Sequence, residues 1–169
     1  TLTGANTYSG TTTISGGTLS VSGSLSDSSA VSVASGATYD VAASDTVKSL
    51  SGAGSVTLGA NTLTLANASG TYSGVMSGTG GLTLTSGTET LTGNNTYSGV
   101  TTIGNGTAAT TLVLSVTGAI ASSADVILVG ASGKLATFDI SGASSGASII
   151  SIKDTSTSGA YDSVVLGTK

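Results

Sequence analysis

The sequence predicts an all-β fold, a right-handed parallel β-helix with three short strands per rung, where a rung is one turn of the coil. Aliphatic residues alternate with Thr or Ser in short runs, which places the aliphatic side chains on one face of a strand. Clusters of Gly, Ser and Asn, typical of turns, separate these runs. A long segment recurs almost unchanged, as is typical of solenoids, and at about 20–25 residues per rung the chain forms roughly seven rungs.

The composition excludes several classes of function. Of 169 residues, 26 are Gly and 7% are charged, and Pro, Cys, Trp and His are absent. Without His or Cys, the Ser-His-Asp and Cys-His catalytic arrangements cannot form, and without Cys there are no disulfides. Four basic residues and a net charge of −4 argue against nucleic-acid binding. No apolar run is long enough for this segment to insert into a membrane as a helix.

The alternating runs define the strands in order along the chain. The predicted strands cover residues 12–14, 19–21, 31–33, 56–58, 63–65, 82–84 and 112–114. Runs of three to five residues suit the sides of a coil, whereas strands of a β-sandwich are usually about five or six residues long. A β-sandwich is therefore the second fold that the pattern allows.

The chain is predicted to be a single β-solenoid segment, residues 1–169, with two long internal repeats at about 2–90 and 91–169. Residues 2–14 read LTGANTYSGTTTI and residues 91–103 read LTGNNTYSGVTTI. Two near-identical copies indicate two similar stretches of coil. We expect the chain to be excised from a longer protein.

The repeat also predicts which side chains point inward. Leu-Ser-Val at 19–21 matches Leu-Ser-Val at 114–116 after an insertion in the second copy. The six extra residues are expected to form a loop at residues 104–110, where Gly, Asn and Ala concentrate. The pairs expected to occupy equivalent inward positions are Ile14 with Ile103, Leu19 with Leu114, and Val21 with Val116.

Several strings imitate functional motifs. The string GNGTAA at 104–109 fits a dinucleotide-binding pattern, but a β-branched run follows it where that motif requires a helix, so a turn is the preferred interpretation. Asn67, Asn94 and Asn105 begin glycosylation sequons, which arise by chance in a chain this rich in Ser, Thr and Asn. Asn94, with Asn61 and Asn95, is expected at corners of the coil, tolerating a left-handed backbone and capping backbone groups.

The aromatic and acidic residues leave two alternatives open. Tyr8, Tyr72 and Tyr97 share a Tyr-Ser-Gly context. They form either an exposed line that stacks on sugars or, as the repeated context favours, rings packed at corners between rungs. Asp40 and Asp45 are the two acids that a rung of this length can bring together, and a solvated or turn-forming pair is preferred over a catalytic one.

The residues therefore predict no catalytic, cofactor-binding or metal-binding site. With no His and with exposed, ionised carboxylates, stability is expected to change little between pH 5 and 8.

Residues 2–21 and 72–103 closely resemble the autotransporter-associated β-strand repeat, also called the passenger-associated transport repeat. Residues 49–65 resemble the spacer that this family often carries. Leu84 departs from the family, which commonly has Lys in this run. The resemblance implies the passenger β-helix of a type V autotransporter, secreted or on the cell surface of a Gram-negative bacterium after passage through the periplasm and outer membrane.

The resemblance implies a structural stalk, or transport-repeat segment, that supports export and surface display and is not an enzyme. Its implied partner is the protein's own C-terminal outer-membrane β-barrel. An adhesin that binds host glycans or associates with itself is the main alternative. Ice binding would need Thr pairs at the same place on every rung, yet the Thr-x-Thr pairs occur in unlike contexts. A carbohydrate-active β-helix enzyme is disfavoured by the missing catalytic residues.

Overall fold

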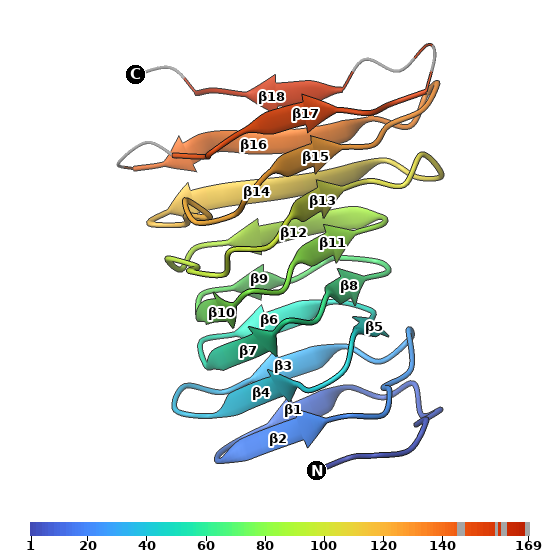
Figure 1. The fold of residues 1–169 in the computed structure, drawn as a ribbon, viewed down its shortest axis with the longest axis vertical. Coiled ribbons are helices and arrows are strands. Elements are labelled where there is room, and N and C mark those ends of the chain that lie inside the picture. The colour runs from blue at the N-terminus through green and yellow to red at the C-terminus, as the bar shows by residue number, and fades with distance from the viewer. Residues whose placement is uncertain (145–147, 158, 160–161, 168–169) are drawn as a thin grey trace.

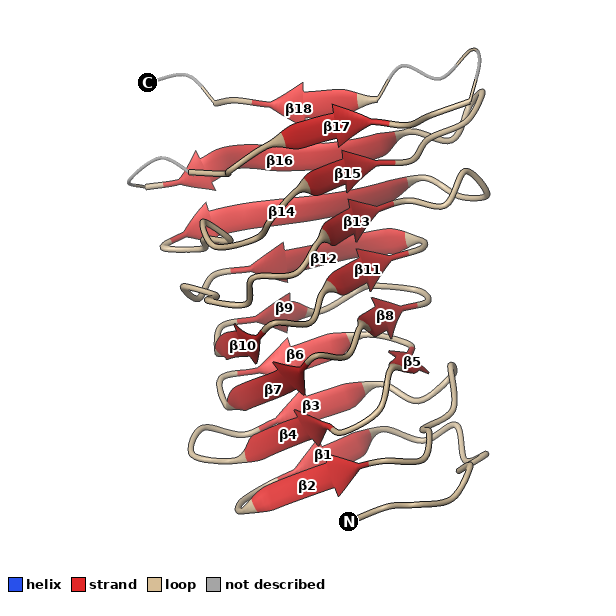
Figure 2. Cartoon of the chain, viewed as in Figure 1, coloured by secondary structure: helices blue, strands red, loops and turns tan. Residues whose placement is uncertain are grey.

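The computed structural model describes residues 1–144, 148–157, 159 and 162–167. In this part of the chain all named elements are strands, and they stack in one coil with the two termini at opposite ends (Figures 1 and 2). The strands form three parallel sheets, I, II and III, with eight, four and six described strands. The predicted all-β parallel solenoid is therefore confirmed, and its coil has three sides, as predicted.

The three sheets contain the strands as follows. Sheet I consists of β1 (Thr12–Ile14), β3 (Val31–Val33), β6 (Leu50–Gly52), β9 (Thr71–Tyr72), β12 (Gly87–Leu91), β14 (Thr110–Val116), β16 (Ala136–Ala143) and β18 (Ser163–Val165). Sheet II consists of β2 (Thr18–Val21), β4 (Thr38–Val41), β7 (Ser55–Gly59) and β10 (Val75–Gly78). Sheet III consists of β5 (Asp45–Val47), β8 (Leu63–Leu65), β11 (Leu82–Leu84), β13 (Thr101–Ile103), β15 (Val126–Leu128) and β17 (Ile152–Asp154).

The coil is right-handed. The chain passes from sheet I to sheet II, then to sheet III, and returns to sheet I one rung further along. In Figure 1 the near strands run to the right, the far strands run to the left, and the coil climbs from the N terminus. This combination defines a right-handed turn, the usual hand for parallel strands joined by crossovers.

The rungs lengthen toward the C terminus. Thr12 pairs with Val31, nineteen residues later, whereas Thr110 pairs with Ala136, twenty-six residues later. From β12 onward the named strands alternate between sheets I and III. The third side is formed there by irregular segments, which include the bridge between Asn94 and Ala119.

Inward side chains stack into columns that form the core. On sheet III the column consists of Val47, Leu65, Leu84, Ile103 and Leu128, paired in succession and buried. Each fully buried side chain of this size stabilises the fold by about 1.5–3 kcal/mol. The outward face of the same strands carries Thr46, Thr64, Thr83 and Thr102 in register.

The two copies of the long segment lie on different sheets. β1 belongs to sheet I, whereas its counterpart β13 belongs to sheet III. The chain makes four full turns between β1 and β12 and then passes two more sides to reach β13. Ile14 and Ile103 are both buried, as predicted, but they face the core from different sides. The repeated segment therefore specifies its contacts with the next rung, not the face of the coil on which it lies.

Two predicted equivalences are wrong, that of Val21 with Val116 and that of Leu19 with Leu114. Val116 is 56% exposed and has a φ of 59°, a conformation that β-branched residues rarely adopt. Pairing with the next rung gives the correct match: Leu19 pairs with Tyr39, and Leu112 pairs with Phe138. Leu19 therefore corresponds to Leu112. The two-residue difference leaves the same face inward, so that Leu114 is buried as predicted.

The predicted loop is present between β13 and β14, at residues 104–109. Thr18, the first residue of β2, corresponds to Thr111 by the same pairing with the next rung. Ile14 lies four residues before Thr18, whereas Ile103 lies eight residues before Thr111. The insertion therefore contains four residues rather than six. The string GNGTAA lies in this loop and a strand follows it, as the turn interpretation requires.

Candidate functional site

The Tyr and Thr of the repeated motif join a Ser of the next rung in a chain of hydrogen bonds. The Tyr97 hydroxyl lies 2.7 Å from Oγ1 of Thr101, which lies 2.9 Å from Oγ of Ser123. Ser123 in turn donates to the carbonyl of Gly99 at 2.9 Å. In a single direction from Tyr97 to Gly99, the Tyr97 hydroxyl donates, and the hydroxyls of Thr101 and Ser123 each accept once and donate once. We call this arrangement the motif network.

The first copy forms the same network. Tyr8 lies 2.7 Å from Thr12, Thr12 lies 3.1 Å from Ser29, and Ser29 donates to the carbonyl of Gly10 at 2.7 Å. The burial differs, because Tyr8 is 42% exposed at the N-terminal end of the stack and Tyr97 is 0% exposed within it. The same residues therefore make the same inter-rung contacts on two different sheets.

An Asn in each copy completes the motif's contacts with neighbouring rungs. Asn95 is buried, donates through Nδ2 to the carbonyls of Gly93 and Ala119, and accepts from the Met76 amide at 2.9 Å. Asn6 likewise donates to the carbonyls of Gly4 and Ser24.

The predicted corner residues fulfil the capping role in part. Asn61 donates to the carbonyl of Val41, and Asn95 satisfies backbone groups of three rungs. Asn94 is exposed and pairs with Ala119 through its backbone. The expected left-handed backbone is wrong for all three, because the non-glycine residue with positive φ in the described chain is Val116.

The third Tyr-Ser-Gly makes a different contact. Tyr72 is fully buried and donates its hydroxyl to the carbonyl of Gly54 at 2.7 Å. Burial raises the pKa of Tyr72 and of Tyr97, so both phenols remain protonated. Neither ring presents a face to solvent, so these two tyrosines cannot stack on a sugar, and packing between rungs is the correct interpretation for them.

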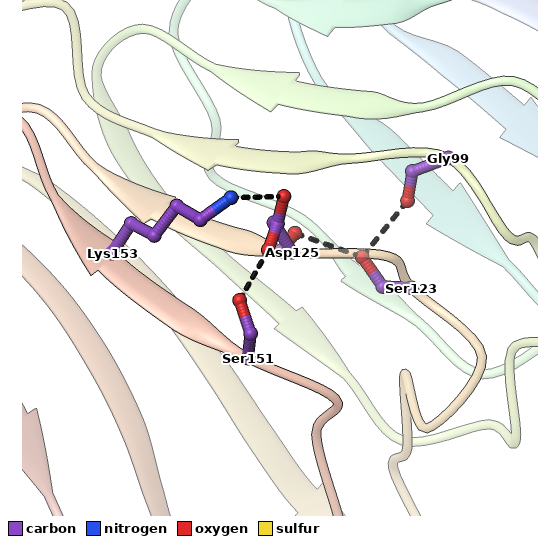
Figure 3. Close-up of polar contacts among 5 residues, drawn as sticks. All are labelled: Gly99, Ser123, Asp125, Ser151 and Lys153. Atoms are coloured by element: carbon purple, nitrogen blue, oxygen red, sulfur yellow. Dashed lines mark hydrogen bonds and ion pairs between the residues drawn. The ribbon is translucent and has the colours of Figure 1, made fainter.

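Figure 3 shows polar contacts that continue the network toward the C terminus. Oγ of Ser123 lies 3.1 Å from the carbonyl of Asp125, whose carboxylate accepts from Lys153 Nζ at 2.7 Å and from the Ser151 hydroxyl. These hydrogen bonds, the one from Lys153 first, lower the pKa of Asp125. Lys153 is paired with the carboxylate and is not hydrogen-bonded to Ser151, so it is not placed to activate that hydroxyl as a base. The contact joins β15 to β17.

The two acids considered for catalysis are not together. Asp40 lies on the outer face of sheet II, paired with Ser20 and Thr57, whereas Asp45 points inward from sheet III. Asp45 borders a hollow of about 330 Å³ and accepts backbone hydrogen bonds from Leu25 and Thr46. Burial raises the pKa of Asp45 above its usual range. The pair that the sequence singled out is therefore absent from the described chain.

Glu89 is the buried acid that the sequence interpretation missed. Its side chain is 0% exposed, Oε2 accepts from the Gly70 amide at 3.2 Å, and Oε1 has no hydrogen-bond partner. Burial, opposed only by backbone hydrogen bonds, raises its pKa to about 8. The expectation that all carboxylates are exposed is therefore wrong. The sequence does carry a signal for this burial. Glu89 lies two residues before the inward Leu91, and side chains two residues apart on a strand point to the same face.

The described residues contain neither a metal-binding cluster nor a membrane-spanning helix. No cluster of three or more His, Cys, Asp or Glu residues is placed to hold a metal ion there. Over the same residues, no helix is both long and apolar enough to cross a bilayer.

One family model matches part of the chain. The family model of the passenger-associated-transport-repeat matches residues 1–21, the stretch that contains Asn6, Tyr8 and Thr12. The match confirms the resemblance seen in the sequence at residues 2–21. No curated protein and no solved structure gave a significant match to the chain.

Proposed function

We propose that this chain, a segment of an autotransporter passenger that carries a passenger-associated-transport-repeat at residues 1–21, is a structural stalk that supports export and surface display. The repeat is a structural repeat of passenger domains and not an enzyme family. We propose no catalytic role for the chain. Its proposed partner is a C-terminal translocator barrel, and its proposed location is the surface of a Gram-negative bacterium or the surrounding medium.

The observation that carries the proposal is the motif network, present in both copies. In each copy a Tyr hydrogen-bonds a Thr of the same motif, and that Thr hydrogen-bonds a Ser of the next rung, at Ser29 and at Ser123. A motif whose polar side chains bind the next rung is suited to stacking rungs. In the second copy, where Tyr97, Thr101 and Ser123 are all buried, it leaves no side chain of the network free to recognise a ligand.

The topology supports growth of the coil during export. Each rung contacts its neighbours in sequence, so the coil can extend without closing long loops. As a rung emerges, its motif hydroxyls find partners on the adjacent rung, 17 residues away for Thr12 with Ser29 and 22 residues away for Thr101 with Ser123. Free energy released by each added rung disfavours backward movement of the chain.

The test uses two substitutions in one strand of the full-length protein that carries this chain, expressed in a Gram-negative host. Leu84→Asp places a charge in the core, whereas Thr83→Asp places the same charge on the outer face of β11. We expect Leu84→Asp to reduce the surface-exposed fraction, measured by protease accessibility on intact cells, and Thr83→Asp to retain it. Equal display of the two variants would contradict the coupling of coil folding to export.

An adhesive role is the second candidate, supported by the outward column Thr46, Thr64, Thr83 and Thr102 on sheet III. The column also revises the argument on ice binding, because Thr64 and Thr83 do occupy the same place on successive rungs. Ile127 and Lys153 continue the column, so it is not a regular Thr array. Cell aggregation and glycan-array binding that are lost in Thr64→Lys would favour adhesion over a purely structural role.

A further inference from the structure

Glu89 occupies a place in the core where its neighbours are apolar. It points inward from β12 and pairs with Leu112 of β14. On the opposite side, the pairing of Thr90 with Thr71 places Gly70 against Glu89. Leu112 is fully buried, as is Leu91 on the same face of β12. The carboxyl group is therefore enclosed between two rungs, away from water.

The space for the carboxyl group exists because residue 70 is Gly. A Cβ on Gly70 would lie 1.8 Å from the carbonyl oxygen of Leu50 and 3.0 Å from Oε1 of Glu89. The Glu89 carboxyl uses the room that a side chain at position 70 would fill. The Gly70 amide donates a hydrogen bond to Oε2 of this carboxyl group at 3.2 Å.

No cation faces this carboxyl group from the elements packed against it. β14 contains no titratable residue, β6 contains none, and Glu89 is the one titratable residue of β12. β9 contributes Tyr72, whose hydroxyl donates its hydrogen bond to the carbonyl of Gly54. An ionised carboxylate would therefore be buried with one oxygen unpaired, which is costly, whereas a protonated carboxyl is tolerated.

We propose that Glu89 is a pH-dependent release point in the middle of the coil, which holds the rungs of β9, β12 and β14 together when protonated and lets them separate locally when ionised. The proton leaves to water through the local opening, and the exposed carboxylate is then solvated. The exposed side chain loses its proton near pH 4.5, whereas the pKa of Glu89 in the folded coil is about 8. Opening therefore releases a proton, and it becomes easier as pH rises from about 4.5 to about 8. Above about pH 8 Glu89 is ionised in both the folded and the open state, so a further rise in pH does not change the free energy of opening. The proposal is independent of the export role.

The direct test is a titration of this one side chain. Glu89 is the only glutamate in the sequence, so glutamate labelled with ¹³C at the δ-carboxyl gives a single resonance in the 169-residue chain. We expect its midpoint near pH 8. A midpoint near 4.5 would overturn the proposal, and this measurement needs no variant to fold.

The second test measures local opening by hydrogen exchange at a series of pH values. Each wild-type measurement is divided by that of Glu89→Gln at the same pH, which removes the intrinsic pH dependence of exchange. We expect the ratio for amides of β12 and β14 to rise by up to about tenfold per pH unit between pH 5 and 8, and that for β3 and β4 to rise less. Asp40→Asn, at a half-buried acid on the outer face of sheet II, is the matched control and should follow the wild type. An unchanged ratio across this range would refute the proposal.

Discussion

The motif network predicts that the same Thr→Val substitution lowers the free energy of unfolding by different amounts in the two copies. Thr101→Val replaces a buried hydroxyl by a methyl group of similar size and leaves the buried Tyr97 hydroxyl without its acceptor. A buried hydroxyl without a partner costs about 1–3 kcal/mol. Ser123 keeps its bond to the Gly99 carbonyl, so we expect a total cost of about 2–3 kcal/mol.

Thr12→Val is the matched control that the chain itself provides. It removes the equivalent hydroxyl, but Tyr8 is 42% exposed and water can replace the lost partner. We expect a cost below about 1 kcal/mol, within the range of surface substitutions that leave no buried group unpaired. The difference between the variants therefore comes from burial and not from the chemistry of the substitution.

Urea denaturation followed by far-ultraviolet circular dichroism measures both costs, provided that each variant unfolds in one transition. The double variant Tyr97→Phe with Thr101→Val removes both hydroxyls and should cost less than the sum of the single substitutions, because no buried group is left unpaired. Equal costs for Thr101→Val and Thr12→Val, or additive costs in the cycle, would refute the reasoning.

Three further predictions concern the core and the loop. The free energy of unfolding should fall by about 3–4 kcal/mol as pH rises from 5 to 8, because burial raises the pKa of Glu89 from 4.5 to about 8 and folding then takes up a proton; denaturant melts at each pH check this, and a flat profile contradicts it. Gly70→Ala should destabilise by more than about 2 kcal/mol, since its Cβ meets a backbone carbonyl, whereas Gly10→Ala meets nothing within 4 Å and should be silent in a thermal melt. Deleting residues 105–108 should cost less than about 1 kcal/mol, whereas Leu114→Asp should cost several kcal/mol because it buries an unpaired charge; the reverse order in denaturant melts would show that the alignment of the two copies is wrong.

Some of the network partners carried a signal in the sequence. Ser29 and Ser123 each lie in a Ser-Ser-Ala string, at 28–30 and 122–124, and this match extends the repeat beyond the strings that first identified it. Glu89 precedes the inward Leu91 by two residues, so strict alternation predicts that it points inward. A carboxylate was assumed to be solvated because burying a charge is costly, but a raised pKa removes the charge instead.

The sequence by itself determined the fold and most of the core. Alternation of aliphatic residues with Thr and Ser has the period of a strand, so the inward positions of Ile14, Leu65, Leu84 and Leu114 follow from local pattern alone. Gly-rich strings marked the corners, because turns need backbone conformations that other residues adopt at a cost. The repeated motif predicted that two stretches of chain make similar contacts.

Only the tertiary structure decided where those contacts lie. The second copy is displaced by two sides of the coil, and Leu19 corresponds to Leu112 rather than to Leu114. Both results depend on the number of residues in each rung, which grows from nineteen to twenty-six between Thr12 and Ala136. Loops absorb these extra residues outside the strands, so distance along the sequence does not determine position around the coil. Hydrogen bonding between adjacent rungs fixes the register instead, and it links residues that no local pattern connects.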